Sequence, residues 1–554
     1  MLRATRVLSF AALAAAVLTC LTFGVGDVSD PLLLLWLRSV QWLTIALGLF
    51  WALRERSAPA WRVKVPLAGW LSVLTLSAVA APAHRDEAVA TLTRPISGAL
   101  LAWAVYAVAC SPKRWLLLSR SVASGGLIVT VVGLADVAGV QPVQSWLSTL
   151  HDGPVPVGDV PRLASLLSHP NVAASMLELT LPLLVAATIA APRAWRAPMV
   201  AALLLQLAAL SLTFSRAGMI GALVALAVLA ALAARQGARQ ALAPVGVAAV
   251  AAPMTLGFAA ATLPPVEHRM LAELEQASYR ATYAAPSQVT VAPDQVVEVP
   301  VTVTNVSSSE WTPLDNSRVA LGYHLLRADG TPLEFDSPAT LVPADLPPLA
   351  SLPVVAHVRA PAEVGLYVVE WDALREGVAW FSWRGSPTTA TALVVIPNAP
   401  ARPAPPEAEE VAMPRPARIQ YWLAAWAMLR DFPVLGVGPD NFRLRFSEYT
   451  GAEESHIGTH AHSVYLESLA DSGVLGFAAL CGFLIGLLWY VSRGLTADRY
   501  WLWRGALLAS LVAWLVHGLV DDFERFLPTH LAFWIVVGLA VRGRELLQRA
   551  QRPE

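Results

Sequence analysis

Two histidines separated by one residue, His460 and His462, lie just before an apolar segment in the stretch GTHAHSVYLESLADSGVLGF, residues 458–477. An unperturbed histidine has a pKa of about 6.5, which suits it to take a proton from a hydroxyl near neutral pH. Three arginines stand at similar places beside other apolar segments: Arg162, Arg216 and Arg418. Because a guanidinium fork matches phosphate oxygens, these residue types together suit binding of a phosphorylated substrate and deprotonation of an acceptor.

Each of these residues also has a plainer interpretation. An arginine at the end of a membrane helix commonly extends toward the water interface without binding a ligand. His462 could simply bond to backbone at a helix N-terminus, and the side chain of His460 would diverge from it and support the loop. A zinc site formed by His456, His460 and His462 is a further alternative, but no cysteine joins them, and we expect no metal.

The chain as a whole has the composition of a polytopic membrane protein. Its 554 residues are 56% hydrophobic and 14% charged, with a mean hydropathy of +0.54. A membrane span needs about 20 apolar residues. Twelve segments are predicted to be spans: residues 6–23, 31–53, 65–82, 96–110, 115–137, 172–191, 197–213, 217–233, 241–262, 474–492, 502–520 and 526–541.

Loop charges predict the orientation of these spans. Lysine and arginine concentrate in alternate loops, which the positive-inside rule assigns to the cytoplasm together with both termini. No basic tract indicates a nucleic-acid partner. Cys20, Cys110 and Cys481 all fall inside predicted spans, so neither a disulfide framework nor a cysteine metal site is expected.

About 210 residues separate the ninth and tenth predicted spans, on the predicted outer side. Valines alternate with polar residues in VVEVPVTVTN, residues 296–305, as in a half-buried strand. Six to eight such short strands predict an immunoglobulin-like all-β sandwich over residues 286–398. Four aromatic residues crowd one part of it, as ordinary core or as a sugar-stacking surface, and strand alternation would turn about half of them outward: Trp371, Trp380, Phe381 and Trp383.

These patterns divide the chain into six parts. We predict nine spans in residues 1–262, an outer connecting segment in 263–285, the sandwich in 286–398, a proline-rich linker in 399–416, an outer interfacial helix with a catalytic loop in 417–463, and three spans in 464–554. The fold class is therefore a mainly α membrane bundle with an inserted β domain. Trp422, Trp426 and Leu429 form the stripe of the interfacial helix.

Four motifs together resemble the signature of the O-antigen ligase and polymerase superfamily. They are ARIQYWLAAWAMLRDFPVLGVGPDNF (417–442), THAHSVYLESLADSGVLGF (459–477), PRLASLLSHPNVAASMLELTLPLL (161–184) and LTFSRAGMIGALVAL (212–226). Ser463 departs from the family pattern, which usually has asparagine there. The turn DFPVLGVGPDNF lacks the Gly-Lys-Ser/Thr of a nucleotide-binding loop and is interpreted as a rigid turn.

The resemblance implies a bacterial inner-membrane glycosyltransferase that moves a glycan from polyprenyl pyrophosphate to an acceptor hydroxyl on the outer face. In this interpretation His462 is the general base, no cofactor is needed, and six residues bind substrate: Arg216, Arg418, Arg162, His169, Asn171 and His460. The acceptor stays open among lipid A core for a ligase, a repeat unit for a polymerase, and serine or threonine for a protein oligosaccharyltransferase.

Other classes of protein remain as alternatives. A transporter or flippase of lipid-linked sugars would show inverted repeats, which we do not find in the sequence. A sensor whose sandwich binds ligand would not require twelve spans. Glu178, inside the sixth predicted span, is expected to pair with Arg216. His517, Asp521 and Asp522 are interpreted as a solvated helix end.

Overall fold

The computed structural model describes residues 2–22, 31–150, 156–157, 160–238, 245–246, 279–311, 318–334, 337–375, 379–397, 399, 418–450, 460–495 and 498–550. Most of the predicted ninth span, of the connecting segment and of the proline-rich linker lies outside these residues. The chain divides into two compact units. The first contains Met1–Glu267, Leu429–Asn441 and Ala461–Glu554, and the second contains His268–Met428 and Phe442–His460.

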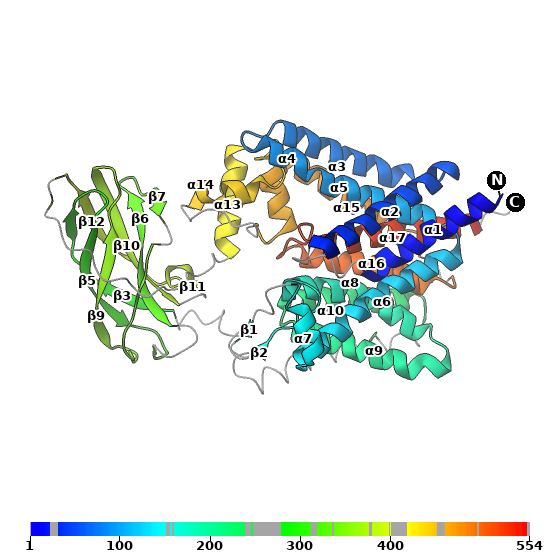
Figure 1. Cartoon of the computed structure of the whole chain (residues 1–554), viewed down its shortest axis with the longest axis horizontal. Helices are drawn as coiled ribbons and strands as arrows, with labels where there is room; N and C mark the ends of the chain where they lie inside the picture. The colour runs from blue at the N-terminus through cyan, green and yellow to red at the C-terminus, as the bar shows by residue number, and fades with distance from the viewer. Residues whose placement is uncertain are drawn as a thin grey trace. The chain divides into compact units, whose positions relative to one another are not determined.

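The first unit is helical (Figure 1). Its helices are α1 (Leu2–Thr22), α2 (Pro31–Arg54), α3 (Trp61–Val79), α4 (Arg85–Thr91), α5 (Thr93–Val108), α6 (Pro112–Val137), α7 (Gln141–Leu147), α8 (Pro170–Ile189), α9 (Arg193–Leu212), α10 (Arg216–Arg235), α15 (Val464–Ser492), α16 (Trp501–His517) and α17 (Leu527–Ala550). A two-stranded hairpin of β1 (Pro156–Val157) and β2 (Val160–Pro161) precedes α8.

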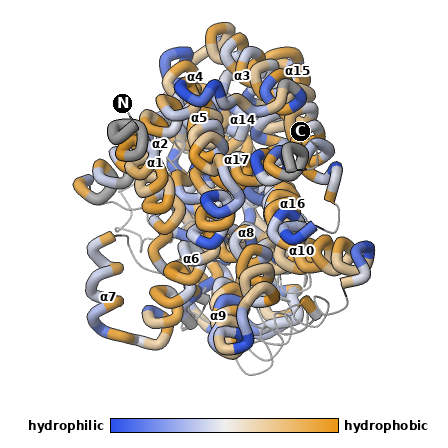
Figure 2. Tube along the Cα trace, turned by 90° about the vertical axis from the view of Figure 1, so that its right-hand side faces the viewer, coloured by the Kyte–Doolittle hydropathy of each residue, from blue (hydrophilic) through white to orange (hydrophobic). Residues whose placement is uncertain are grey.

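Among the described residues, seven helices are long and apolar enough to cross a membrane. They cover Arg62–Val79, Arg85–Val108, Pro112–Val137, Pro170–Ile189, Arg193–Leu212, Arg216–Arg235 and Val464–Ser492. Two shorter apolar helices are Val7–Thr22 and Trp501–His517. Hydrophobic residues recur along the helices of this unit (Figure 2). The length and hydropathy of these helices are typical of a membrane protein. The count of twelve spans stays a prediction.

Helix α8 is the centre of the first unit, with nearly all of its residues buried. It packs against α6, α9, α10, α16 and α17. Glycines on two neighbours permit this close approach: a Cβ at Gly126 of α6 would lie 2.2 Å from Oγ1 of Thr180, and one at Gly221 of α10 would lie 2.3 Å from Oε2 of Glu178. Any larger residue at either position would push its helix away from α8.

The second unit holds two β-sheets with a shared hydrophobic core. Its strands are β3 (Ala281–Ala284), β4 (Gln288–Val291), β5 (Val296–Asn305), β6 (Val319–Arg327), β7 (Pro332–Glu334), β8 (Thr340–Leu341), β9 (Ser351–Arg359), β10 (Gly365–Arg375), β11 (Ala379–Trp380) and β12 (Thr389–Val395). One sheet has the order β4-β12-β10-β6-β7, with β11 beside β10 and β8 beside β6; the other has the order β3-β5-β9. The alternation predicted for residues 296–305 is present, since the four valines at 297, 299, 301 and 303 are buried.

The expectation that half of the sandwich aromatics face outward is wrong. Trp371, Trp380 and Phe381 are completely buried, and Trp383 packs partly against the same core. Strand alternation does not apply because β11 ends at Trp380 and the chain then enters the 3₁₀ turn η3 (Ser382–Arg384). Consecutive residues at that change of structure both point inward, so these rings form core and not a sugar-stacking face.

Two helices follow the β-sheets, α13 (Arg418–Asp431) and α14 (Asn441–Thr450). Helix α13 buries Tyr421 and Met428, and Tyr421 stacks on Phe446 of α14 with ring centroids 4.9 Å apart. Its exposed apolar stripe consists of Ile419, Leu423 and Trp426. The predicted stripe is therefore shifted: Trp426 is exposed as expected, while Trp422 is partly buried.

Candidate active site

The turn before α14 is bound to a break in α15. Gly473 has φ 62° and ψ −168°, which interrupts the helix between Val464–Ser472 and the long apolar segment that follows. The amides of Val474 and Leu475 lose their helical acceptors there and donate to the carbonyls of Pro433 and Val434, at 2.9 and 3.3 Å. In return, the amides of Val437 and Gly438 donate to Ala470 and Asp471 in α15, at 2.9 and 2.8 Å. This exchange satisfies the backbone groups that the break exposes.

Glycines make this contact possible. Gly436 has φ 69°, and a Cβ there would lie 2.4 Å from the carbonyl carbon of Asp471. A Cβ at Gly473 would lie 2.4 Å from the carbonyl carbon of Val434. The Ser77 hydroxyl of α3 donates to the carbonyl of Leu435 at 2.6 Å and lies 3.0 Å from that of Asp471. The glycine motif thus positions the segment before the histidines, in agreement with its interpretation as a rigid turn.

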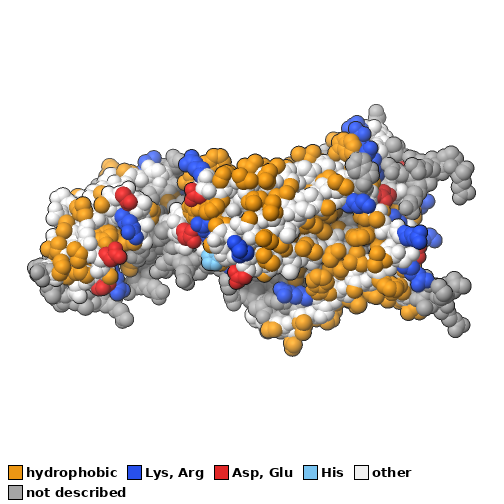
Figure 3. Space-filling view, turned by 90° about the horizontal axis from the view of Figure 1, so that it is seen from above, with side chains coloured by type: hydrophobic (Ala, Val, Ile, Leu, Met, Phe, Trp, Pro, Cys, Tyr) orange, Lys and Arg blue, Asp and Glu red, His pale blue; other side chains and the backbone are white. Residues whose placement is uncertain are grey.

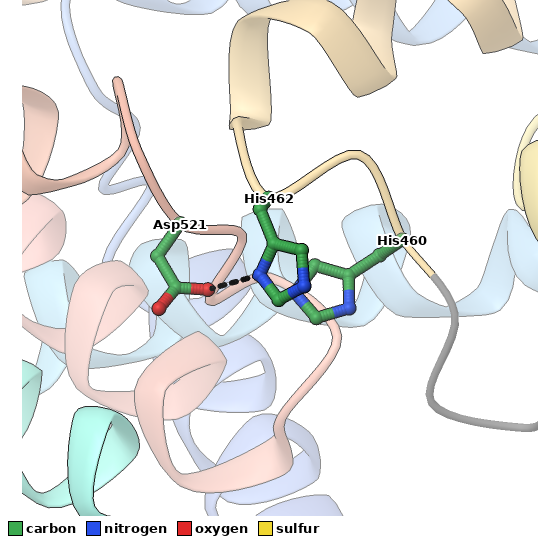
Figure 4. Close-up of side chains that lie close together, drawn as sticks. All are labelled: His460, His462 and Asp521. Carbon is green, nitrogen blue, oxygen red and sulfur yellow. Dashed lines mark ion pairs between the residues drawn. The ribbon is translucent and has the colours of Figure 1, made fainter. Parts of the chain in front are cut away.

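A chain of polar contacts connects three of the sequence motifs. Arg162 is buried, and its Nε donates to the Thr213 carbonyl at 2.9 Å while Nη2 donates to Oδ1 of Asn171 at 3.1 Å. Asn171 Nδ2 donates to Oδ2 of Asp521 at 3.0 Å. Asp521 Oδ1 lies 3.7 Å from Nδ1 of His462 (Figure 4). The described structure therefore links the loop before α8, the loop after α16 and the residue before the α15 cap.

His462 has a constrained backbone and an accessible side chain. Its φ is 46°, a left-handed conformation that costs a non-glycine residue about 1–2 kcal/mol. The imidazole is 27% exposed beside a carboxylate that is 6% exposed. Ser463 then caps α15, with its Oγ accepting from the Leu466 amide at 3.4 Å. The departure from asparagine at this position therefore keeps a capping group.

A second polar cluster lies beside the glycine turn. Arg525 contacts Asp440 at 2.9 Å and Glu467 at 3.6 Å. Glu467 also accepts from the Ala461 amide, and Asp471 accepts from the Asp440 amide at 2.7 Å. Burial alone would lower the pKa of Arg525, but the surrounding carboxylates outweigh it and raise that pKa. Arg525 therefore stays charged and holds the turn, the start of α15 and the loop after α16 together.

An adjacent cavity of about 150 Å³ lies within the first unit. Its apolar wall includes Trp70, Phe483 and Trp534, whose rings are mutually stacked. Seven charged residues also line it: Arg94, Asp440, Glu467, Asp471, Asp522, Glu524 and Arg525. Carboxylates outnumber arginines in this set, so the cavity suits hydroxyl-bearing groups better than phosphate. His462 and Asp521 do not line it, but Val464 and Asp522 do.

Two sequence-based expectations about the buried acids are wrong. Glu178 contacts His517, with Oε1 2.9 Å from Nδ1, and both side chains are completely inaccessible. The helix end His517, Asp521 and Asp522 is buried, not solvated. The sequence reasoning missed Asp521 as a partner of His462 because the residues lie 59 positions apart (521 − 462). The one sequence signal for Asp521 was that two acids, Asp521 and Asp522, follow an apolar segment directly.

The predicted substrate-binding residues fall into different environments. Arg216 begins α10, directly after the cap Ser215, and is exposed. Arg162 is instead buried in protein contacts. His169 caps α8, its Nδ1 accepting from the Asn171 amide at 3.1 Å. Arg418 begins α13, is exposed, and belongs to the second unit.

A metal ion is the other arrangement that these side chains permit. His460, His462 and Asp521 each offer a possible ligand atom, and these atoms lie within 4.8 Å of one another (Figure 4). However, Oδ2 of Asp521 already accepts from Asn171, and Oδ1 accepts from the Asp522 amide at 3.0 Å. The carboxylate is thus held in the loop by two hydrogen bonds while Oδ1 still faces Nδ1 of His462, so we interpret the site as a histidine–aspartate pair.

Comparisons with known proteins agree with the motifs. Residues 408–481 match the family model described as O-Antigen ligase, which supports the resemblance to the O-antigen ligase superfamily. The matched segment contains the glycine turn, His460, His462 and the start of α15. It thus covers one part of the polar site, while Arg162, Asn171, Arg216 and Asp521 lie outside it.

Other comparisons add no functional information. No match was found among curated proteins. A solved structure of Pseudomonas fluorescens alkylpurine DNA glycosylase AlkC, bound to DNA containing an abasic site analog, is 11% identical and covers 61% of this chain and 100% of that chain. Its TM-score is 0.16, so the similarity supports no conclusion about fold or activity.

Proposed function

We propose that this protein transfers a glycan from a polyprenyl pyrophosphate to an acceptor hydroxyl at the outer face of the bacterial inner membrane. The observation that carries this proposal is the polar chain from Arg162 through Asn171 and Asp521 to His462. Residues of two sequence motifs and of the loop after α16 thus converge on one accessible imidazole. A histidine beside an orienting carboxylate is an arrangement suited to general-base catalysis.

In the proposed reaction, Nδ1 of His462 faces Asp521 and Nε2 takes the proton of the acceptor hydroxyl. The hydroxyl oxygen then forms a bond to the anomeric carbon of the donor glycan. The bond from that carbon to the pyrophosphate oxygen breaks, and polyprenyl pyrophosphate leaves with the electron pair. Asp521 stabilises the imidazolium that forms, and Asn171 keeps Asp521 oriented.

The arginines divide into two roles in this proposal. Exposed Arg216 binds the pyrophosphate, whose charge is further favoured at the N-terminus of α10. Arg418 is a second candidate for the same role. Buried Arg162 instead positions Asn171. The hydroxyl groups of a glycan suit the carboxylate-rich end of the cavity, and no cofactor is invoked.

The acceptor decides between a ligase, a polymerase and a protein oligosaccharyltransferase. A lipid-linked sugar transporter is the alternative from another class. The test uses purified full-length protein with a polyprenyl-pyrophosphate glycan and measures release of polyprenyl pyrophosphate with lipid A core, free glycan or peptide acceptors. Acceptor-dependent release is expected. Movement of intact donor across a vesicle bilayer without release would overturn the enzymatic proposal.

A further inference from the structure

Three arginines, Arg62, Arg493 and Arg544, lie near the aromatic rings of Trp489 and Tyr490, at the end of the first unit where the chain ends are marked in Figure 1. There α3 begins, and α15 and α17 end. The guanidinium carbon of Arg493 lies 4.2 Å from the Trp489 ring centroid, and that of Arg62 lies 5.4 Å from it. Trp489 is itself 42% exposed. Two guanidinium groups therefore contact one exposed indole.

A third arginine adds positive charge to this cluster. Arg544 lies over Tyr490, 3.9 Å from the ring centroid, and its Nε is buried without a hydrogen-bond partner among the described residues. Burial lowers the pKa of Arg544, repulsion from Arg62 and Arg493 acts in the same direction, and attraction to Tyr490 and Glu545 only partly offsets these effects. The three cations are thus close enough to repel one another. An anion bound between them would reduce this repulsion.

The neighbouring acid is already engaged elsewhere. Glu545 accepts hydrogen bonds from the hydroxyls of Tyr106 and Tyr490 and, at 3.1 Å, from the Ala60 amide. Its carboxylate therefore holds three helix ends together, and its single negative charge lies near Arg544. One carboxylate does not balance the charge of the three arginines, so these four side chains together are positively charged.

Apolar side chains continue from the cluster along the membrane-facing surface. Ile485, one turn before Trp489 on α15, is 67% exposed, and Val65, one turn after Arg62 on α3, is 57% exposed. Basic side chains gather at this end beside a broad hydrophobic surface (Figure 3). A ligand that matches both would carry an anionic head and apolar chains.

We propose that Arg62, Arg493 and Arg544, around Trp489, bind the phosphate headgroup of an anionic phospholipid from the leaflet at this end of the helical unit. The guanidinium groups match the phosphate oxygens, and the indole and apolar residues lie where acyl chains would run. Free phosphate would use the arginines but not the exposed apolar surface. The assignment does not depend on the proposed glycosyl transfer.

The test uses the full-length protein in a neutral detergent and native mass spectrometry with phosphatidylglycerol, phosphatidylcholine or inorganic phosphate as the probe. The variant is Arg62→Gln with Arg493→Gln, and the matched control is Arg193→Gln with Arg235→Gln, which removes two exposed arginines from other helix ends. Loss of two arginines at the site should weaken phosphatidylglycerol binding by about 30-fold. The control should retain binding, and phosphatidylcholine should bind weakly to all forms.

Three outcomes would overturn the proposal: undiminished phosphatidylglycerol binding by the site variant, equal loss in variant and control, or displacement of the lipid by millimolar inorganic phosphate. Elution as a single species and an unchanged melting temperature establish that the variant is folded. If the double variant fails that check, Arg493→Gln alone, at an exposed position, is compared with the control instead. Its phosphatidylglycerol binding should be weaker by about 5-fold, and undiminished binding would overturn the proposal.

Discussion

Nδ1 of His517 lies 2.9 Å from Oε1 of Glu178, and neither side chain is accessible. This contact fastens the last residue of α16 to α8, four residues before Asp521. The Val464 amide in turn donates to the Gly518 carbonyl at 3.0 Å, which attaches the start of α15 to the same turn. The buried pair therefore fixes both segments that carry the proposed histidine–aspartate pair.

Removing one partner of this pair should strongly destabilise the first unit. Glu178→Leu leaves His517 buried without its partner, and breaking a buried pair typically costs about 3–5 kcal/mol. The melting temperature of the detergent-solubilised protein should fall in Glu178→Leu and in His517→Leu. In the double variant the loss should be smaller than the sum of the two. Additive losses would show that the two residues do not interact.

Loss of the proposed base should affect turnover and not donor binding. His462→Ala should lower turnover by about 10²- to 10⁴-fold. Asp521→Asn should lower it by about 10-fold or more, because the imidazole loses its orienting charge. Donor affinity and melting temperature provide the controls. Turnover equal to that of the unaltered protein in His462→Ala would remove this residue from the mechanism.

The metal alternative has a separate test. His460→Ala should reduce turnover much less than His462→Ala, and a chelator should leave turnover unchanged. Both measurements use the full-length protein and the release of polyprenyl pyrophosphate. Inactivation by chelation that added zinc reverses would instead favour a metal bound by His460, His462 and Asp521.

The two arginines should differ in how they respond to lysine. Arg216→Lys should raise the donor KM by about 10-fold without lowering stability, because a single ammonium cannot fork onto phosphate. Arg162→Lys should lower the melting temperature, since lysine cannot reach both the Thr213 carbonyl and Asn171. A normal donor KM in Arg216→Lys would reduce Arg216 to an interfacial anchor.

The glycine turn should tolerate no added side chain. Gly436→Ala introduces a Cβ 2.4 Å from the backbone of Asp471 at a positive φ, so the turn must separate from α15. We expect a lower melting temperature and a large loss of turnover. Gly482→Ala on α15 is the matched control, because its Cβ would meet nothing within 4 Å. Equal behaviour of the two variants would contradict the proposed docking.

The β unit should fold by itself, and its first strand should add to its stability. β3 pairs with β5 from Ala281 to Ala284, before the predicted boundary at residue 286. A fragment of residues 279–397 should therefore melt cooperatively, with circular dichroism typical of β-structure. A fragment of residues 286–398 should melt at a lower temperature, because one edge of the β3-β5-β9 sheet is missing. Identical melts would show that β3 contributes nothing.

The sequence determined the elements and the class of protein. Continuous apolar segments predicted the helices, because burial in lipid or protein requires uninterrupted hydrophobic surface. Alternating valines predicted β5, because every second side chain of a strand points to the same, buried face of the sheet. The motifs around His462 were sufficient to indicate a resemblance to the O-antigen ligase superfamily, because they are short, contiguous patterns that can be recognised without knowing the fold.

Only the tertiary structure decided which distant residues meet. Nothing in the sequence joins Asp521 to His462 or Glu178 to His517, because these contacts depend on how α8, α15 and α16 pack. Arg162 and Arg216 look alike in sequence, yet one is enclosed by protein and the other is exposed. Packing sets burial, and burial separates a positioning residue from a residue available to substrate.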